Sequence, residues 1–155
     1  MDLKIKQDHL QGAAIIALLQ RHLDYAHEVT PAESIHALDL DGLRAPDVTF
    51  WSVWSDSVLV GCGALRELDP RHAEIKSMHT AEEARRQGVG SAILDHIIGI
   101  ARQRGYIRLS LETGTQEAFA PARALYRRHG FEDCGPFGDY HADPNSAYMT
   151  RILET

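Results

Sequence analysis

The middle of the sequence runs from a strand through a glycine-containing loop and a helix into a further strand. Residues 72–80 are predicted to form a long strand, and the loop Arg85-Arg86-Gln87-Gly88-Val89-Gly90 leads into a helix of about 91–104. The apolar side chains of that helix share one face, and Gly105 follows it in the position where glycine commonly ends helices. Residues 107–112 are predicted as the next strand. This segment favours a sheet with helices packed against it.

Further elements are predicted on both sides of this segment. Periodicity and turn signals predict a strand at 3–6, a helix at about 8–25, a hairpin of strands at 48–54 and 58–66, a helix at about 120–129, and strands at 131–134 and 147–153. A second helix is predicted from about 31 to 38, because Thr30-Pro31-Ala32-Glu33 has the pattern of a capping box with proline at the first helical position. Gly61 and Gly63 indicate a bulge in the second hairpin strand or a close approach of another segment to its backbone.

This order of elements predicts an α/β (α+β) fold in which a mixed central sheet is flanked by about four helices. The chain has 155 residues, with no repeat and no linker rich in proline, glycine or serine. Residues 1–155 are therefore expected to form a single domain, large enough to bury a core without disulfides or metals.

Charge and composition exclude several classes of function. The chain carries 16 Lys and Arg against 22 Asp and Glu, and this net charge of −6 disfavours a broad nucleic-acid surface. The longest apolar run, residues 13–19, is too short to span a membrane, and no export signal is recognised, so a cytoplasmic location is expected. Two cysteines cannot build a disulfide framework, and the histidines lack metal-ligand spacing, so no metal is expected.

The loop that contains Gly88 and Gly90 is the strongest candidate for a ligand site. Glycines let backbone N–H groups approach an anion, the start of the following helix adds further N–H groups, and the two arginines add charged donors. A phosphate or pyrophosphate would suit such a site, although two glycines can also serve a turn alone. A dinucleotide fingerprint is disfavoured because Ile93 stands where a small residue is needed, yet Glu112 ends the next strand where a ribose-binding acid would be expected.

Three segments of the sequence resemble the GNAT superfamily of N-acetyltransferases. They are Glu74-Ile75-Lys76-Ser77-Met78, the loop from Arg85 to Gly90, and Ala122-Arg123-Ala124-Leu125-Tyr126-Arg127-Arg128-His129-Gly130-Phe131. The loop matches the family's pyrophosphate motif, and the last segment matches its later helix and following strand. The order of predicted elements agrees over nearly the whole chain, and further stretches are similar to a small bacterial subgroup of that family.

The resemblance implies acetyl-CoA or a related acyl-CoA as the donor. The backbone N–H groups of Arg86, Gln87, Gly88, Val89, Gly90 and Ser91, beside the Arg85 side chain, would hold the pyrophosphate. The backbone of Met78, His79 and Thr80 would pair with the pantetheine arm, and an N–H there would polarise the thioester carbonyl. Phe119 stands where many members of the family have an asparagine that contacts CoA, and its ring could only pack against pantetheine.

The resemblance also implies the catalytic groups. Tyr126 would protonate the departing CoA thiolate, a transfer that the ordinary pKa values of a phenol and a thiol make only mildly demanding. Glu74 would take the proton from the acceptor ammonium. Two alternatives stay open: Glu74 only pairs with a Lys or Arg side chain, or water alone takes the proton. The acyl group would pass directly from donor to acceptor within a ternary complex.

The acceptor is expected to be a primary amine of a small molecule or a peptide, and net acidity favours a cationic one. His36 and Tyr140 are the candidate acceptor contacts, because the family's first helices and last strands wall this pocket. A homodimer is possible, without nucleic-acid or membrane partners. Two alternatives stay open, a non-catalytic module that binds acyl-CoA and a protein that binds a nicotinamide dinucleotide.

Overall fold

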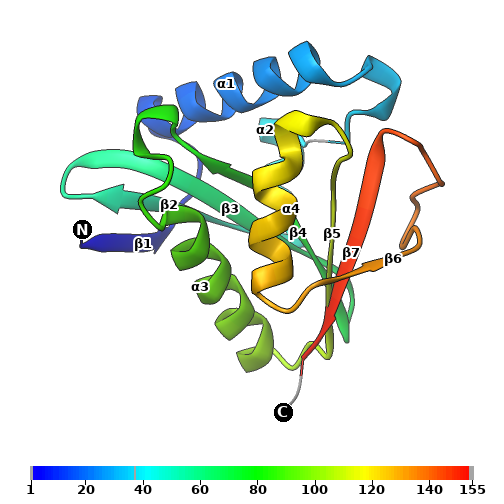
Figure 1. Ribbon diagram of the computed structural model, residues 1–155. Coiled ribbons are helices and arrows are strands. Elements are labelled where there is room, and N and C mark those ends of the chain that lie inside the picture. The colour runs from blue at the N-terminus through cyan, green and yellow to red at the C-terminus, as the bar shows by residue number, and fades with distance from the viewer. Residues whose placement is uncertain (1, 37, 154–155) are drawn as a thin grey trace.

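A computed structural model describes residues 2–36 and 38–153 and shows one mixed sheet (Figure 1). The strand order is β1-β2-β3-β4-β5-β7-β6, and only β4 and β5 are parallel neighbours. The strands are β1 (Leu3–Gln7), β2 (Val48–Ser55), β3 (Val58–Asp69), β4 (His72–Thr80), β5 (Arg108–Gly114), β6 (Glu132–Cys134) and β7 (Ser146–Ile152). The expected mixed sheet is confirmed.

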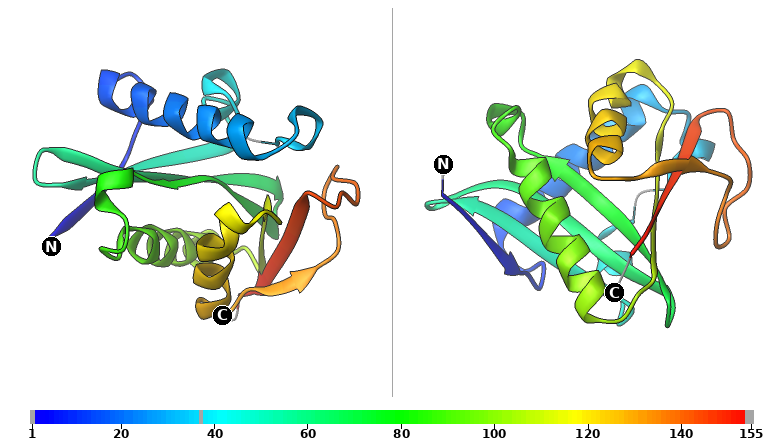
Figure 2. Two further views of the ribbon diagram at one scale, coloured as in Figure 1. Left: turned by 45° about the horizontal axis from the view of Figure 1, so that its top comes forward. Right: turned by 60° about the horizontal axis from the view of Figure 1, so that its bottom comes forward.

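Helices cover both faces of the sheet, as the left view of Figure 2 shows. One face carries α1 (Ala13–Val29) and the short α2 (Leu40–Leu43), and the other carries α3 (Val89–Gln103) and α4 (Ala120–Arg128). Single 3₁₀ turns precede three of these helices: η1 (Ala32–Ser34), η2 (Glu82–Ala84) and η3 (Glu117–Phe119). The expected fold class, a sheet flanked by about four helices, is therefore confirmed.

The core lies between the sheet and the apolar faces of α1 and α3. Spacings of three and four residues bring Ile93, Ile97 and Ala101 of α3 to the sheet, where each is at most 1% exposed. Leu18 of α1 is fully buried against the opposite face. Burying one such leucine or isoleucine contributes about 1.5–3 kcal/mol relative to leaving it in water, so this packing fixes the positions of the helices that frame the site.

The helix predicted at 31–38 is wrong within the described residues, and Ala37 lies outside them. The chain forms only the turn η1, because Pro31 is extended (ψ 141°) and no side chain caps the turn. Instead, the Ser34 hydroxyl donates to Asp143 at 2.6 Å, and the His36 carbonyl accepts from Lys76 at 2.9 Å. These distant partners replace the helical hydrogen bonds, and α2 follows instead, capped by Asp39, which accepts from the N–H of Gly42.

Other predicted boundaries shift by a few residues. α1 begins at Ala13 rather than near residue 8, because Asp8 accepts from the Leu10 N–H in a local turn in which Leu10 has φ 64°. α3 begins at Val89, directly after Gly88, whose φ of 81° suits glycine. The predicted bulge is confirmed, since the pairing of β3 shifts register near Gly61 and Gly63.

β4 and β5 separate along their length, and this separation creates the site. Their ladder ends at the pair Ile75↔Leu111, whereas β4 continues to Thr80 and β5 to Gly114. A bulge accompanies the separation, because Ser77 has φ 55° and the β3–β4 register jumps nearby. The backbone of β4 beyond Ile75 is therefore not in the ladder with β5 and borders the gap.

Candidate functional site

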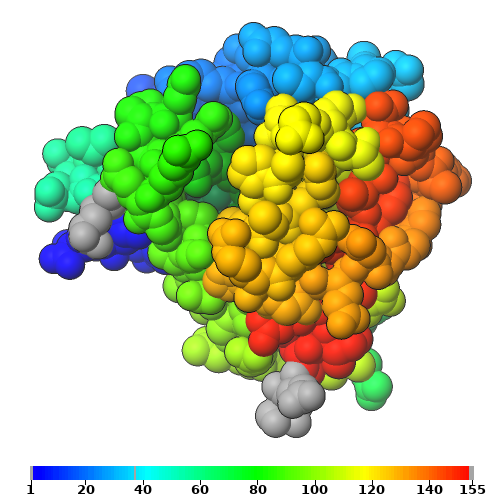
Figure 3. Space-filling view, in the orientation of Figure 1, coloured from blue at the N-terminus to red at the C-terminus, as the bar shows by residue number. Residues whose placement is uncertain are grey.

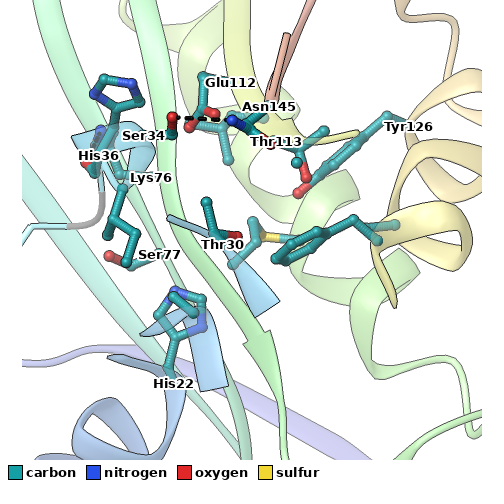
Figure 4. A pocket seen from close by; sticks show the side chains of 17 residues that line it. His22, Thr30, Ser34, His36, Lys76, Ser77, Glu112, Thr113, Tyr126 and Asn145 are labelled. Atoms are coloured by element: carbon teal, nitrogen blue, oxygen red, sulfur yellow. Dashed lines mark hydrogen bonds between the residues drawn. The ribbon is translucent and has the colours of Figure 1, made fainter. Parts of the chain in front are cut away.

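A cavity of about 140 Å³ lies where β4 and β5 separate, bounded by α1, α4 and the loop before β7 (Figure 4). Its lining includes Met78 of β4, Glu112 of β5, Phe119 of the turn η3 and Tyr126 of α4. On the surface, the molecule is hollowed between the green segment that precedes α3 and the yellow α4 (Figure 3). The structure thus brings together three residues that the sequence analysis assigned separately: Met78, Phe119 and Tyr126.

Tyr126 reaches from α4 toward β5, with its hydroxyl on the side of Glu112 and Thr113 (Figure 4). The side chain is 6% exposed, and its ring packs edge-on against Phe131. Burial raises the pKa of the phenol, and the Glu112 carboxylate raises it further. The phenol therefore stays protonated at neutral pH and can donate a proton or a hydrogen bond into the cavity.

The glycine-containing loop opens at the start of α3, as predicted. The first helical bond runs from the Ala92 N–H to the Gly88 carbonyl, so the preceding N–H groups at this end are free of helical acceptors. Arg86 also has a positive φ, 66°, next to Gly88. Gly90 serves packing as well, because a Cβ there would lie 2.9 Å from Leu125 Cδ2 of α4. Of these two glycines, therefore, Gly88 is required by its backbone conformation and Gly90 by its packing.

The side chains around this loop point in different directions. Arg85 lies over the ring of Tyr25 in α1, with its guanidinium 5.9 Å from the ring centroid, beside a separate cavity of about 270 Å³. Arg86 and Gln87 are exposed, and the Gln87 amide donates to the Glu83 carbonyl at 3.5 Å. The Ser91 hydroxyl lies 3.1 Å from His129 Nε2. The cationic charge of Arg85 is thus directed toward α1.

His79, in the second half of β4, contacts α1 through its ring. Its Nδ1 lies 3.2 Å from Nδ1 of His22, and the two ring centroids are 4.8 Å apart. Burial lowers the pKa of His22 to about 4 and that of His79 to about 3, where the charges of His22, Arg85 and Arg21 act in the same direction. In a hydrogen bond between the two Nδ1 atoms, one imidazole must donate and the other accept, and two neutral imidazoles can fill these roles. The ring of His79 is therefore engaged with α1, and the predicted contact of its backbone with a ligand stays a prediction.

Glu74 forms a buried network with Lys76 and Tyr140. The Tyr140 hydroxyl donates to Glu74 Oε2 at 2.5 Å, and Lys76 Nζ lies 3.5 Å from the same oxygen. Lys76 Nζ also donates to the Tyr140 oxygen and to the His36 carbonyl, both at 2.9 Å. Burial raises the pKa of Tyr140, and the Glu74 carboxylate adds to the effect. Glu74 is 1% exposed, so the Tyr140 hydroxyl and the Lys76 ammonium take the place of water around its carboxyl group.

This network lines a third cavity, of about 600 Å³, that includes both predicted acceptor contacts, His36 and Tyr140. This larger cavity adjoins the smaller one, of about 140 Å³, that Tyr126 lines. The ring of His36 packs edge-on against that of Tyr140, with centroids 4.9 Å apart. Lys76 and His36 line both cavities, whereas Glu74 and Tyr140 line only the larger one and Tyr126 only the smaller. The structure therefore places the two predicted catalytic residues on different cavities that share a wall.

Phe119 forms part of the apolar wall of the smaller cavity. Its ring covers Gly114 at the end of β5, where any Cβ would overlap it, and it packs edge-on against Tyr25. Phe119 is also the residue that precedes the first turn of α4. The ring thus closes the cavity beside Tyr126 without offering a hydrogen bond.

Lys76, Ser34 and Asn145 are among the polar residues of the smaller cavity that sequence reasoning missed. Lys76 shares a strand face with Glu74, and this spacing of two could have identified it. Ser34 and Asn145 come from loops, and the Asn145 amide donates to the Ser34 hydroxyl at 3.3 Å (dashed line in Figure 4). No local pattern relates these two residues, because 111 positions separate them along the chain.

No helix in the described parts of the chain is long and apolar enough to cross a membrane. Within residues 2–36 and 38–153, no group of three or more His, Cys, Asp or Glu side chains is arranged to hold a metal ion.

Comparison with known proteins gives a consistent result. The model of the acetyltransferase (GNAT) family matches residues 13–131. The uncharacterised N-acetyltransferase YsnE of Bacillus subtilis is 53% identical over 149 residues, which cover 96% of this chain and 99% of that protein.

Solved structures share the fold. A structure from Klebsiella pneumoniae, described as an acyl-CoA N-acyltransferase, is 29% identical, covers 98% of both chains and superposes with a TM-score of 0.79. A GNAT family acetyltransferase from Elizabethkingia anophelis, solved with acetyl-CoA bound, is 18% identical and covers 97% of this chain and 98% of its own, with a TM-score of 0.68.

Proposed function

Since the chain belongs to the GNAT family of acetyltransferases, we propose that it moves an acetyl group from acetyl-CoA directly to a primary amine of a small molecule or a peptide. One observation carries the proposal. β4 borders the cavity that Tyr126 lines and ends at Thr80, whose hydroxyl oxygen lies 4.0 Å from where a Cβ of Gly90 at the start of α3 would be, so donor binding and acid catalysis can occur along one strand.

The donor would lie along the gap and the start of α3. Backbone N–H groups of residues 86–91 and the positive end of the α3 dipole suit a pyrophosphate, supported by the positive φ of Arg86 and Gly88. The β4 backbone at residues 78–80 lies beyond the ladder with β5 and is available to the pantetheine amides. The related structure from Elizabethkingia anophelis, which was solved with acetyl-CoA, agrees with this choice of donor.

Tyr126 would act as the general acid. The raised pKa of its phenol keeps the proton in place until a thiolate forms beside it. Phe119 and Met78 line the same cavity and would exclude water around the thioester.

The acceptor would enter through the larger cavity, past His36 and Tyr140. Six acidic and two basic side chains line this cavity: Glu33, Asp47, Glu67, Glu74, Asp139 and Asp143, with Arg66 and Lys76. This excess of negative charge favours a cationic amine over a neutral or anionic acceptor.

An amine must lose a proton before it attacks the thioester. Glu74 is the base that the family resemblance suggests, with water as the alternative, and its contacts with Tyr140 and Lys76 also suit a positioning role. Replacing Glu74 with glutamine separates the two roles. Loss of a base changes the pH dependence of turnover, whereas loss of positioning weakens acceptor binding.

Thermal unfolding with acetyl-CoA, CoA or NAD tests the proposal first. A ligand at about 100 times its dissociation constant adds about 2.7 kcal/mol of stability, which raises the midpoint by several degrees for a domain of this size. Stabilisation by both CoA compounds but not by NAD supports the donor, and a screen of amines for acetyl transfer follows. Stabilisation by NAD alone would favour a protein that binds a nicotinamide dinucleotide. Binding of acetyl-CoA without transfer to any amine would favour a non-catalytic module that binds acyl-CoA.

Three expectations remain predictions: that residues 1–155 form one domain, that the protein works in the cytoplasm, and that it forms a homodimer. Light scattering on the purified chain tests the last of these.

A further inference from the structure

We propose that Glu112 is the group that takes the proton from the acceptor ammonium. The inference rests on the proposed function and adds a catalytic residue to it. Glu112 belongs to β5, one position beyond the last β4–β5 pair, so its side chain stands where the two strands separate. It lines the same cavity as Tyr126 and Met78, whereas Glu74 lines only the neighbouring one.

Glu112 is more available than Glu74 to an incoming ammonium. Oε2 of Glu74 is held by the Tyr140 hydroxyl, Lys76 lies 3.5 Å away, and the side chain is almost fully buried. Glu112 is half-buried, and among the described residues no Lys, Arg or His nitrogen lies within 4.0 Å of its carboxylate. A carboxylate without a cationic partner in a cavity favours a bound cation.

The surroundings of Glu112 strengthen it as a base. Burial raises its pKa, and the charges of Glu74 and Asp143 act in the same direction, while Ser146 and Lys76 oppose them. The groups that face it come from every neighbouring element: Glu74 and Lys76 of β4, Tyr126 of α4, Asp143 of the loop, Ser146 and Tyr148 of β7, with His22 and His36 across the cavity. Lys76 opposes the rise, but the pKa of Glu112 remains above its ordinary value, so this carboxylate holds an accepted proton more readily than an ordinary glutamate.

The protons balance with two groups. The ammonium passes one proton to Glu112, and the neutral amine attacks the thioester carbonyl. The bond from the carbonyl carbon to nitrogen forms, the bond to sulfur breaks, and Tyr126 gives its proton to the leaving thiolate. The second amine proton restores Tyr126, and Glu112 releases its proton to water. The products are an amide, a free thiol and one proton.

Two kinds of acceptor test the role. Alkyl diamines, an aralkyl amine and a lysine-containing peptide are charged at neutral pH and need a base, whereas an arylamine is already neutral there. Glu112→Gln should lower kcat on the alkylamines by about 10²-fold, within the usual range for acid–base catalysis, and leave transfer to the arylamine close to wild type. The acidic limb of the pH profile for the alkylamine should disappear. Equal rates of wild type and variant on the alkylamine would overturn the proposal.

Controls separate this role from folding and from the proposed function. Glu117→Gln makes the same charge change at an exposed position of η3 and should leave turnover unchanged. The Glu112 variant should keep its unfolding midpoint and its stabilisation by acetyl-CoA. If wild type binds no acetyl-CoA, the proposed function fails, whereas intact binding with unaltered alkylamine turnover in the variant rejects only Glu112.

A titration that needs no acceptor gives a second readout. In protein labelled with ¹³C at the glutamate side-chain carboxyls, the resonance absent from Glu112→Gln identifies Glu112. It should titrate above the ordinary value of 4.5. Titration at or below that value would mean that this carboxylate is exposed to water, and the proposal would fall.

Discussion

The Tyr140 hydroxyl lies 2.5 Å from Oε2 of Glu74, so a loop residue closes a hydrogen bond with the middle of the central sheet. The two residues are 66 positions apart, and Lys76 contacts both. The loop between β6 and β7 is therefore anchored to β4 at the wall that the two cavities share. A buried carboxylate that keeps its charge needs such donors, because an unpaired charge inside a protein is costly.

Replacing Tyr140 with phenylalanine removes the donor and keeps the ring. A hydrogen bond to a charged group contributes about 1.5–3 kcal/mol, so the free energy of unfolding should fall by about that amount. Urea denaturation of Tyr140→Phe measures it. Tyr25→Phe serves as the control, because the Tyr25 ring in α1 contacts Arg85 and Phe119 through its face and edge. Loss of its hydroxyl should lower the free energy of unfolding by less. Equal stability of both variants would show that the contact with Glu74 contributes nothing.

Replacing Tyr126 with phenylalanine tests the general acid. The variant should bind acetyl-CoA as wild type does and lose about 10²-fold or less in turnover, because thiolate is a moderate leaving group. Steady-state kinetics with a saturating donor measure kcat, and thermal shifts with CoA report binding. Unchanged turnover would assign the ring a packing role against Phe131.

Two glycines of one helix should respond in opposite directions to alanine. Gly88 has φ 81°, where a Cβ costs about 1–2 kcal/mol, so Gly88→Ala should lower the free energy of unfolding and weaken acetyl-CoA binding. Gly99 lies inside α3 with open space around its Cα, so Gly99→Ala should stabilise the protein by about 0.5–1 kcal/mol. Urea denaturation of both variants measures the difference. A stabilised Gly88→Ala protein would contradict the left-handed conformation.

The His22–His79 pair should make stability depend on pH. Both pKa values are lowered in the folded protein, to about 4 and about 3, so between the ordinary value of 6.5 and pH 4 the unfolded chain takes up protons that the folded one refuses. The free energy of unfolding should fall as the pH drops below about 6.5 and stay level above it, as far as this pair is concerned.

Denaturation at pH 7.5 and pH 5.0 measures this effect. His22→Gln should reduce the loss between the two pH values, while His9→Gln, at an exposed position, should not. An identical loss in all three proteins would mean that other groups carry the pH dependence.

Local sequence patterns predicted most of the fold but missed most of the residues that line the two cavities of the site. The 3.6-residue periodicity of α3 and its closing Gly105 (φ 85°) are properties of a continuous segment, so the sequence reveals them directly. The capping-box pattern at Thr30 failed because Ser34 bonds to Asp143, 109 positions away. Such tertiary contacts leave no periodic signal. Tyr126 was identified through the family resemblance, whereas the hydrogen bond between Tyr140 and Glu74 is evident only in the structure.

Because Lys76 and His36 line both cavities, donor and acceptor would approach the reacting centre from different sides of one wall. Neither ligand would then block the route of the other, and neither would have to depart before its counterpart arrives. Double-reciprocal rate plots at several fixed acceptor concentrations should accordingly intersect, whereas parallel lines would reveal an acetylated protein as a kinetic intermediate.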